Sequence, residues 1–323
     1  MVSIWAALLV AAALAFAWSI GAHYTGACMG MAYAARAVRL RSALLIMAPL
    51  TFLGAVLASG AVEATVGGQL LAAPVVALPL GFAILVTAFL LTSAYNRVRL
   101  PTSTIQILVF SVVGAGLAAG VPVRWDTILR LVVVWAVVPP GALLLGFVFT
   151  RLTEPTREAA PRAPSATALL GPALVVAGAG ASFVMGANDV SNSSGALLMT
   201  GQMGPLVAAG LGGAGLAVGV ITWGRPLLQR VAFETVELDR RTASIAQFVQ
   251  GGLVLAAVFF GYFTSLNQAL VGAMAGTGLA RGHSTVNRTV FRDILVGWAV
   301  GPASGVTLAF ATTWALRSAG VPL

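Results

Sequence analysis

Residues 102–120, TSTIQILVFSVVGAGLAAG, and residues 264–282, TSLNQALVGAMAGTGLARG, are two versions of one segment. Both open with Thr-Ser, carry a glutamine three positions after the serine, and end in the pattern Gly-x-Gly-Leu-Ala-x-Gly. In each, a polar opening leads into an apolar stretch near the lower limit of the roughly 17 to 25 residues that a membrane helix needs. The repetition predicts that the chain consists of two related halves.

The match between the halves continues in order on both sides of this segment. Gly21, Ala22 and Gly30 return 165 positions later as Gly186, Ala187 and Gly195, and Trp135 and Pro139 return 163 positions later as Trp298 and Pro302. We therefore predict a first transmembrane repeat over residues 1–150 and a second over residues 168–323. Residues 151–167 carry Arg, Glu, Pro, Ser and Thr without an apolar run, so we expect a cytoplasmic linker there.

The composition excludes a soluble protein. Of 323 residues, 59% are hydrophobic and 8% are charged, whereas a soluble domain carries about 25% charged residues. The net charge of +9 is the difference between 18 arginines and 9 acidic residues, but no clustered basic face with interleaved aromatics indicates nucleic acid. The single cysteine, Cys28, and the two histidines, His23 and His283, are too few for a disulfide or a thiolate or imidazole metal centre. We treat Cys28 and His283 as structural.

The apolar runs predict an all-α polytopic membrane protein with five segments in each half. We expect them at residues 3–22, 42–60, 74–95, 102–120 and 127–150, then at 168–190, 205–222, 243–262, 265–281 and 289–316. Five crossings are an odd number, so the second half inserts upside down relative to the first. Such inverted repeats, with short re-entrant or broken helices near the midplane, are typical of secondary transporters. Residues 1–22 lack the basic start of a cleaved signal, so we expect a membrane helix there.

The arginines predict how the protein sits in a membrane. With the N-terminus outside, the inside loops collect 15 of the 18 basic residues: Arg36, Arg39, Arg41, Arg97, Arg99, Arg151, Arg157, Arg162, Arg225, Arg230, Arg240, Arg241, Arg281, Arg288 and Arg292. Only Arg124, Arg130 and Arg317 fall on the other side. By the positive-inside rule, both termini are expected outside a cell (inner) membrane.

One candidate site lies in residues 186–195, GANDVSNSSG, at the end of an apolar run. An acid inside a membrane segment is a functional hypothesis by default, because its charge is costly to bury. Asn188, Asp189 and Asn192 offer oxygen ligands to a coupling cation, Na⁺ or a proton, while Ser193 and Ser194 are candidate donors to an oxyanion. The alternative is an interfacial helix cap.

A second candidate pair lies at the openings of the repeated segment. The expected substrate-binding residues are Thr102, Ser103, Thr104 and Gln106 in the first half, and Thr264, Ser265, Asn267 and Gln268 in the second. Hydroxyls and free N–H groups at a helix N-terminus bind anions. Plain N-capping is the alternative, although it needs only one hydroxyl per helix.

The first-half counterpart of residues 188–190 is also polar. His23, Tyr24 and Thr25 occupy this position and are candidate substrate ligands. For His23 and Tyr24, the alternatives are a proton relay or amphipathic residues at the membrane interface. We expect Glu63 to face water in a loop, and residues 224–242 to form a short surface helix.

Residues 186–192 resemble the signature of the inorganic phosphate transporter family, whose members carry it once per half. Residues 101–104 with 114–116 resemble its second signature, and Trp135 with Pro139 resembles its usual tryptophan and proline. The resemblance implies an inverted-repeat permease that moves an inorganic oxyanion with a cation, usually as a homodimer. In the family the signature Asp and Asn bind sodium beside phosphate, which carries over to Asn188, Asp189 and Asn192.

The departures from the family pattern favour one branch. His23 and Tyr24 replace the first Asn-Asp pair, Ala27 replaces a later asparagine, and Gln106 stands in place of a histidine. These features are similar to the sulfate permease branch, which lacks the first Asn-Asp pair and has glutamine where Gln268 stands. We therefore expect a cation-coupled sulfate importer, with sodium-coupled phosphate symport as the alternative and an anion channel as the reading outside that class. No catalytic dyad or nucleophile motif indicates an enzyme.

Overall fold

The computed structural model describes residues 4–73, 75–153, 164–234, 239–282 and 288–323, and the side chains of all of these except 164–168, 233–234, 288 and 290–291. The first half consists of α1 (Ile4–His23), α2 (Thr25–Ala34), α3 (Leu40–Ala58), α4 (Gly60–Gly68), α5 (Leu78–Arg97), α6 (Thr104–Ala119) and α7 (Trp125–Leu152). The second consists of α8 (Pro164–Asp189), α9 (Ser191–Met199), α10 (Pro205–Trp223), α11 (Arg225–Glu234), α12 (Arg240–Phe259), α13 (Leu266–Arg281) and α14 (Arg288–Ser318). The described residues are therefore almost entirely helical, as predicted.

Eight helical stretches within the described residues are long and apolar enough to cross a membrane. They correspond to four of the five predicted segments in each half, and the short helices α6 and α13 are the fifth. On the outer helices, large apolar side chains such as Leu129, Val133 and Trp314 are exposed. Exposed apolar faces of this extent suit a lipid environment. The chain is a multi-pass membrane protein.

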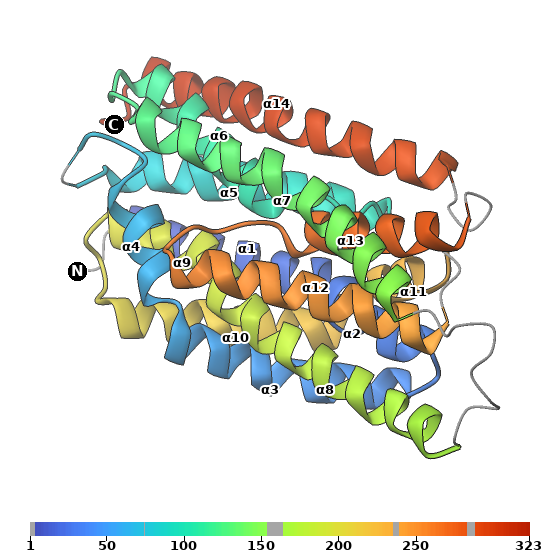
Figure 1. Cartoon of the computed structure of the whole chain (residues 1–323). Helices are drawn as coiled ribbons and strands as arrows, with labels where there is room; N and C mark the ends of the chain where they lie inside the picture. The colour runs from blue at the N-terminus through green and yellow to red at the C-terminus, as the bar shows by residue number, and fades with distance from the viewer. Residues whose placement is uncertain (1–3, 74, 154–163, 235–238, 283–287) are drawn as a thin grey trace.

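The two halves run in opposite directions. Both termini lie at one end of the helix bundle, whereas the end of α7 and the start of α8 lie at the other (Figure 1). The first half thus begins at one end and the second half begins at the opposite end. This arrangement is the predicted inverted repeat.

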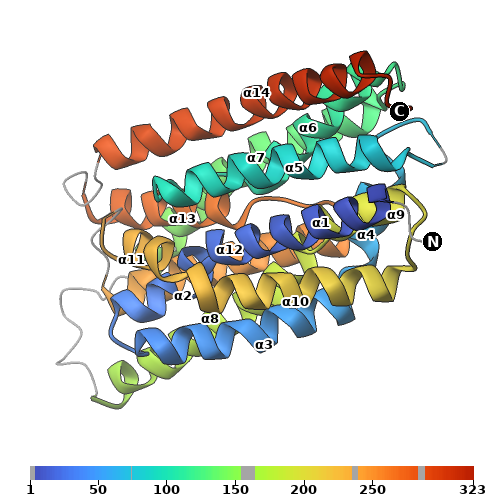
Figure 2. The ribbon, with the colours of Figure 1, turned by 180° about the vertical axis from the view of Figure 1, so that it is seen from behind.

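The halves interlock instead of packing as separate bodies. Helix α6 lies along α14, and its counterpart α13 lies along α7; in the same way α1 lies along α10, and α3 along α8 (Figure 2). Glycines of the repeated segment permit this approach: a Cβ on Gly114 would sit 2.1 Å from the Val306 carbonyl oxygen, and one on Gly276 would sit 2.0 Å from that of Leu143. The conserved spacing between the two copies therefore reflects helix contacts between the halves.

Most described arginines gather at one end of the bundle. There Arg240 donates to the Ala35 carbonyl, Arg241 to that of Thr153, and Arg281 pairs with Asp239 at 3.4 Å. At the end with the termini, Arg124 donates to the Leu71 carbonyl and Arg317 to that of Ala118. The structure thus has one arginine-rich end, as the loop assignment requires; which end faces the cytoplasm stays a prediction.

Three expectations about connecting segments have different outcomes. Glu63 was expected to face water, but it is only 3% exposed, because the loop instead forms helix α4 and packs against α9. The stretch 224–242 does contain a short helix, α11, although Leu227, Leu228 and Val231 on it are buried. In the predicted linker, residues 154–163 lie outside the described residues, as does His283, and 164–167 belong to α8. The proposed repeat boundaries stay a prediction.

Candidate functional site

The two predicted glycine-flanked patches are breaks between consecutive helices. In the first half, α1 ends at His23 and α2 begins at Thr25; in the second, α8 ends at Asp189 and α9 begins at Ser191. The break residues themselves, Tyr24 and Val190, are buried. The helical hydrogen bonding continues through both positions, because the Tyr24 N–H donates to the Ile20 carbonyl at 3.2 Å and the Val190 N–H to that of Gly186 at 3.3 Å. The polar side chains beside these one-residue breaks, and not freed backbone groups, therefore make them candidates for ligand binding.

The repeated hydroxyl patches are extended segments that enter α6 and α13. Ser103 and Ser265 are the N-caps, and each accepts a hydrogen bond at 3.3 Å from the backbone N–H of the glutamine three residues later. Each serine therefore caps its helix, and the cap uses one lone pair of the hydroxyl oxygen. The hydroxyl proton of an N-cap serine stays available as a donor.

An amide clamp joins the second break to the entrance of α13. The Asn188 side chain donates to the Thr264 carbonyl at 2.8 Å and accepts from the Thr264 N–H at 3.2 Å. It also donates to a carboxylate oxygen of Asp189 at 3.0 Å. One asparagine thus orients both the acid and the backbone at the start of α13.

A histidine makes the corresponding clamp in the first half. His23 Nε2 accepts from the Thr102 N–H at 3.0 Å, and Nδ1 lies 2.6 Å from Asn96 Oδ1. Asn96 donates its own amide to the Ser19 carbonyl, so its oxygen faces the histidine and Nδ1 carries the proton, an assignment that rests on the hydrogen-bond network. His23 is fully buried inside the protein, so its ring does not lie on the surface of the bundle. Its ring is neutral in this arrangement and holds the entrance of α6.

Asp189 lies at the centre of a buried polar cluster from both halves. Asn192 donates to it at 3.4 Å and to the Thr104 hydroxyl at 3.3 Å, and the Tyr24 hydroxyl lies 3.1 Å from the same threonine oxygen. The side-chain oxygen Oδ1 of Asn192 and the Thr264 hydroxyl are buried and have no hydrogen-bond partner. Buried polar atoms without a partner point to a ligand.

Two glutamines connect the halves directly. The Gln106 amide donates to Gln268 at 3.3 Å, and the Gln268 amide donates back at 3.0 Å. Asn267 reaches across as well and donates to the Thr102 carbonyl at 3.0 Å. The openings of α6 and α13 therefore face each other. No side chain of this cluster is more than 8% exposed.

Four of the predicted ligands use their hydroxyls elsewhere. Thr25 donates to the Gly224 carbonyl, Thr102 to that of Gly297, Ser193 to that of Val190, and Ser194 to the Glu63 carboxylate. In this arrangement they do not point into the cluster. Their assignment to the substrate stays a prediction.

Polar residues that the sequence analysis did not single out also lie beside the cluster. Asn96 orients His23, and on α12 the buried Gln247 donates to the Ala27 carbonyl and contacts Gln250 at 2.6 Å. The Gln247 oxygen and the Gln250 nitrogen have no partner. Amides inside apolar runs were the available signal, because polar groups in membrane helices are rare unless they are used.

The charge of the site comes from its acid. Among the described residues, Asp189 and Glu63 are the buried acids, and no arginine is buried. No group of three His, Cys, Asp or Glu side chains in the described chain forms a candidate site for a multivalent metal. The cluster offers one carboxylate, amide oxygens and neutral donors, which suit a proton or a small monovalent cation beside an anion.

Comparisons with known proteins agree with this architecture. The model of the phosphate transporter family matches residues 20–163 and again residues 153–309. The chain is 28% identical to the sulfate permease CysP of Bacillus subtilis over 308 positions, covering 92% of this chain and 84% of that protein. It is 26% identical to a putative phosphate permease of Pyrococcus furiosus over 377 positions, covering 90% and 92%. A solved structure of a sodium-dependent phosphate transporter has the same fold, with a TM-score of 0.87, 23% identity, and coverage of 97% and 98%.

Proposed function

This chain belongs to the phosphate transporter family, and from that premise we propose that it imports an inorganic oxyanion, sulfate foremost, coupled to a cation gradient through Asp189. The observation that carries the proposal is the buried cluster in which Asp189 and Asn188 lie beside the facing openings of α6 and α13. The amides and hydroxyls there would hold the anion, helped by the positive ends of two helix dipoles.

The coupling ion would balance charge that the site itself leaves uncompensated. An oxyanion next to Asp189 brings like charges together where no arginine of the described chain is buried. A proton or Na⁺ bound with the anion removes that repulsion, so both bind best together. The oxygens of Asp189 and Asn192 and the Thr264 hydroxyl are the ligands we propose for Na⁺.

The first half supports sulfate as the substrate. Tyr24 stands where the second half has Asp189, so the cluster contains one carboxylate instead of two. Sulfate carries no proton at neutral pH and therefore gives a carboxylate no hydrogen to accept. Phosphate carries one or two protons and can donate to a carboxylate. The name of the Bacillus subtilis relative agrees with this choice. Sodium-coupled phosphate uptake is the second candidate, favoured by the names of the other relatives.

The test is uptake of radiolabelled sulfate or phosphate into proteoliposomes under a proton gradient or a sodium gradient imposed separately. We expect sulfate to accumulate against its own gradient, with excess sulfate but not phosphate blocking it. Phosphate accumulation would replace sulfate by the second candidate. Equilibration without accumulation under either gradient would indicate a channel and overturn coupling.

Two further features stay part of the proposal. The homodimer that the family resemblance implies is one of them. We also infer a place in the cell membrane with both termini outside, because the arginine-rich end follows the positive-inside rule. Protease accessibility of tags at either terminus in intact cells checks the orientation.

A further inference from the structure

Glu63 is a second buried acid, on a short helix outside the cluster just described. It lies on α4, at 3% exposure, and its carboxylate accepts a hydrogen bond of 2.5 Å from the Ser194 hydroxyl on α9. Close packing brings the two helices together: a Cβ on Gly195 would sit 2.3 Å from a methyl group of Val66. Helix α9 begins at Ser191, two residues after Asp189 at the end of α8.

No basic side chain compensates this carboxylate within the described residues. Helix α4 packs mainly on α9 and more lightly on α8 and α12. Helices α4 and α9 carry no other ionisable residue, the described part of α8 carries Asp189, and α12 carries Arg240 and Arg241. Those arginines bond to Ala35 and Thr153 at the arginine-rich end. A buried carboxylate without a positive partner is costly and takes up a proton or a cation instead.

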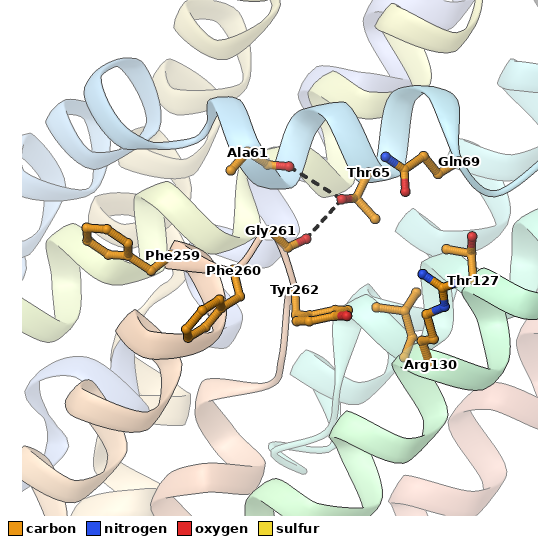
Figure 3. Close-up of a pocket in the computed structure, with 10 residues that line it drawn as sticks. Ala61, Thr65, Gln69, Thr127, Arg130, Phe259, Phe260, Gly261 and Tyr262 are labelled. Carbon is orange, nitrogen blue, oxygen red and sulfur yellow. Dashed lines mark hydrogen bonds between the residues drawn. The ribbon is translucent and has the colours of Figure 1, made fainter.

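The opposite face of α4 borders a cavity of about 410 Å³ (Figure 3). Ala61 and Thr65, which flank Glu63 along the chain, line it together with Arg130 and Tyr262, and Thr65 donates to the Gly261 carbonyl at 2.9 Å. The Arg130 side chain is 68% exposed and its ion pair with Asp126 spans 3.7 Å, so the cavity opens to the molecular surface beside two charged groups. Only the thickness of α4 separates it from Glu63.

We propose that Glu63 is a second coupling site, which binds one proton per transport cycle from the end of the bundle where the termini lie. The inference rests on the proposed function and adds to it. A cation such as Na⁺ needs several oxygen ligands at once, whereas the hydroxyls beside Glu63 are those of Ser194 and Ser59, and Ser59 also donates to the Ala55 carbonyl at 2.6 Å. The remaining neighbours on α4 and α9 include Val66 and Gly195, which offer no side-chain oxygen. The O–H bond forms at one side of the membrane and breaks at the other, with no change of oxidation state.

The transport test measures how much anion accumulates per unit of pH gradient, with membrane potential held at zero. Each coupled proton multiplies the steady-state accumulation by about ten per pH unit, so Glu63→Gln is expected to lower it about tenfold per unit. The control, Asp126→Asn, removes an exposed acid at the same end and should leave the accumulation unchanged. Equal accumulation in Glu63→Gln and wild type overturns the proposal.

A second measurement reads the proton directly and does not need transport. In infrared spectra recorded with Asp189→Asn as the background, the carbonyl stretch of a protonated carboxylic acid should be present at neutral pH and absent once Glu63→Gln is added. Burial raises the pKa of the Glu63 carboxyl, so the band should persist to higher pH than for an exposed glutamate. An unchanged band with Glu63→Gln overturns the proposal, whereas a wild type that accumulates neither anion overturns only the proposed function.

A third variant, Ser194→Ala, tests the hydrogen bond to Glu63 without removing the acid. Ser194→Ala keeps the acid but removes its donor, which raises the pKa of Glu63 further. The pH at which uptake is half-maximal should therefore move upward while the number of coupled protons stays the same. An unmoved pH profile contradicts a role for the Glu63–Ser194 contact.

Discussion

The break between α1 and α2 and the break between α8 and α9 lie at matching positions in the two halves and differ in chemistry. In both, a side chain at the end of the long helix clamps the backbone that enters the short helix of the repeated segment: His23 at Thr102, Asn188 at Thr264. The next residue is a phenol in one half, Tyr24, and an acid in the other, Asp189. The repeat therefore fixes where groups are placed, whereas the individual residue decides whether the position carries charge.

The two clamps also differ in what they contact, because only the second-half clamp reaches an acid. His23 is held by Asn96 and makes no contact with an acid, while Asn188 bonds both to Thr264 and to Asp189. Removing the clamp side chain in each half should separate effects on stability from effects on transport.

The largest effect is expected for Asp189→Asn. Asparagine keeps the shape and removes the one buried charge of the cluster, so cation-driven accumulation should fall by at least about 100-fold, equivalent to roughly 3 kcal/mol of lost coupling. Gel filtration and thermal unfolding should show a folded protein. Wild-type accumulation in this variant would remove Asp189 from the mechanism.

The two clamps are compared by Asn188→Ala and His23→Ala. Each leaves a buried backbone N–H without its acceptor, so each should lower the free energy of unfolding by about 1–3 kcal/mol. Uptake should fall further in Asn188→Ala, because that change also releases Asp189. Thermal unfolding in detergent and initial uptake rates provide the measurements. Equal loss of uptake in both variants would mean that the clamps act only through stability.

Tyr24→Phe tests whether the first-half position takes part in the site at all. It removes the hydroxyl that contacts Thr104 and also interacts with Ser265 and Asp189. The loss of at least one buried hydrogen bond of about 1 kcal/mol should raise the half-saturation concentration about fivefold or more. The fold should hold, since the ring stays. An unchanged half-saturation concentration would assign Tyr24 to packing alone.

The smallest effect is expected where the halves are most alike. Ser103→Ala with Ser265→Ala removes two N-caps, each worth about 1 kcal/mol of stability, and two candidate donors to the anion. We expect the half-saturation concentration to rise by about two- to fivefold, close to one lost neutral hydrogen bond. Thr307→Ala, on the exposed face of α14, is the control. Lower stability with unchanged affinity would leave capping as the whole role.

Tryptophans at the repeated position show how far the symmetry extends. Trp135 donates its indole N–H to the Phe263 carbonyl at 2.9 Å and so holds the extended approach to α13. Its counterpart Trp298 is buried at the indole nitrogen without a partner. Identical residues at matching positions therefore do not guarantee matching contacts, and the sequence comparison could not distinguish the two.

Apolar run lengths and the repeat were sufficient to predict the membrane segments, their inverted arrangement and the residues from 188 to 192 as a polar interruption. These features follow from local physics, since a bilayer demands long apolar helices and penalises a lone acid such as Asp189. Only the tertiary structure decided which polar groups meet. The neutral tautomer of His23 depends on Asn96, 73 positions away, and the burial of Glu63 depends on α9, 131 positions away. Hydrogen bonds between distant segments form through packing of the two interlocked halves, and the order of residues along the chain does not show which distant segments will pack together.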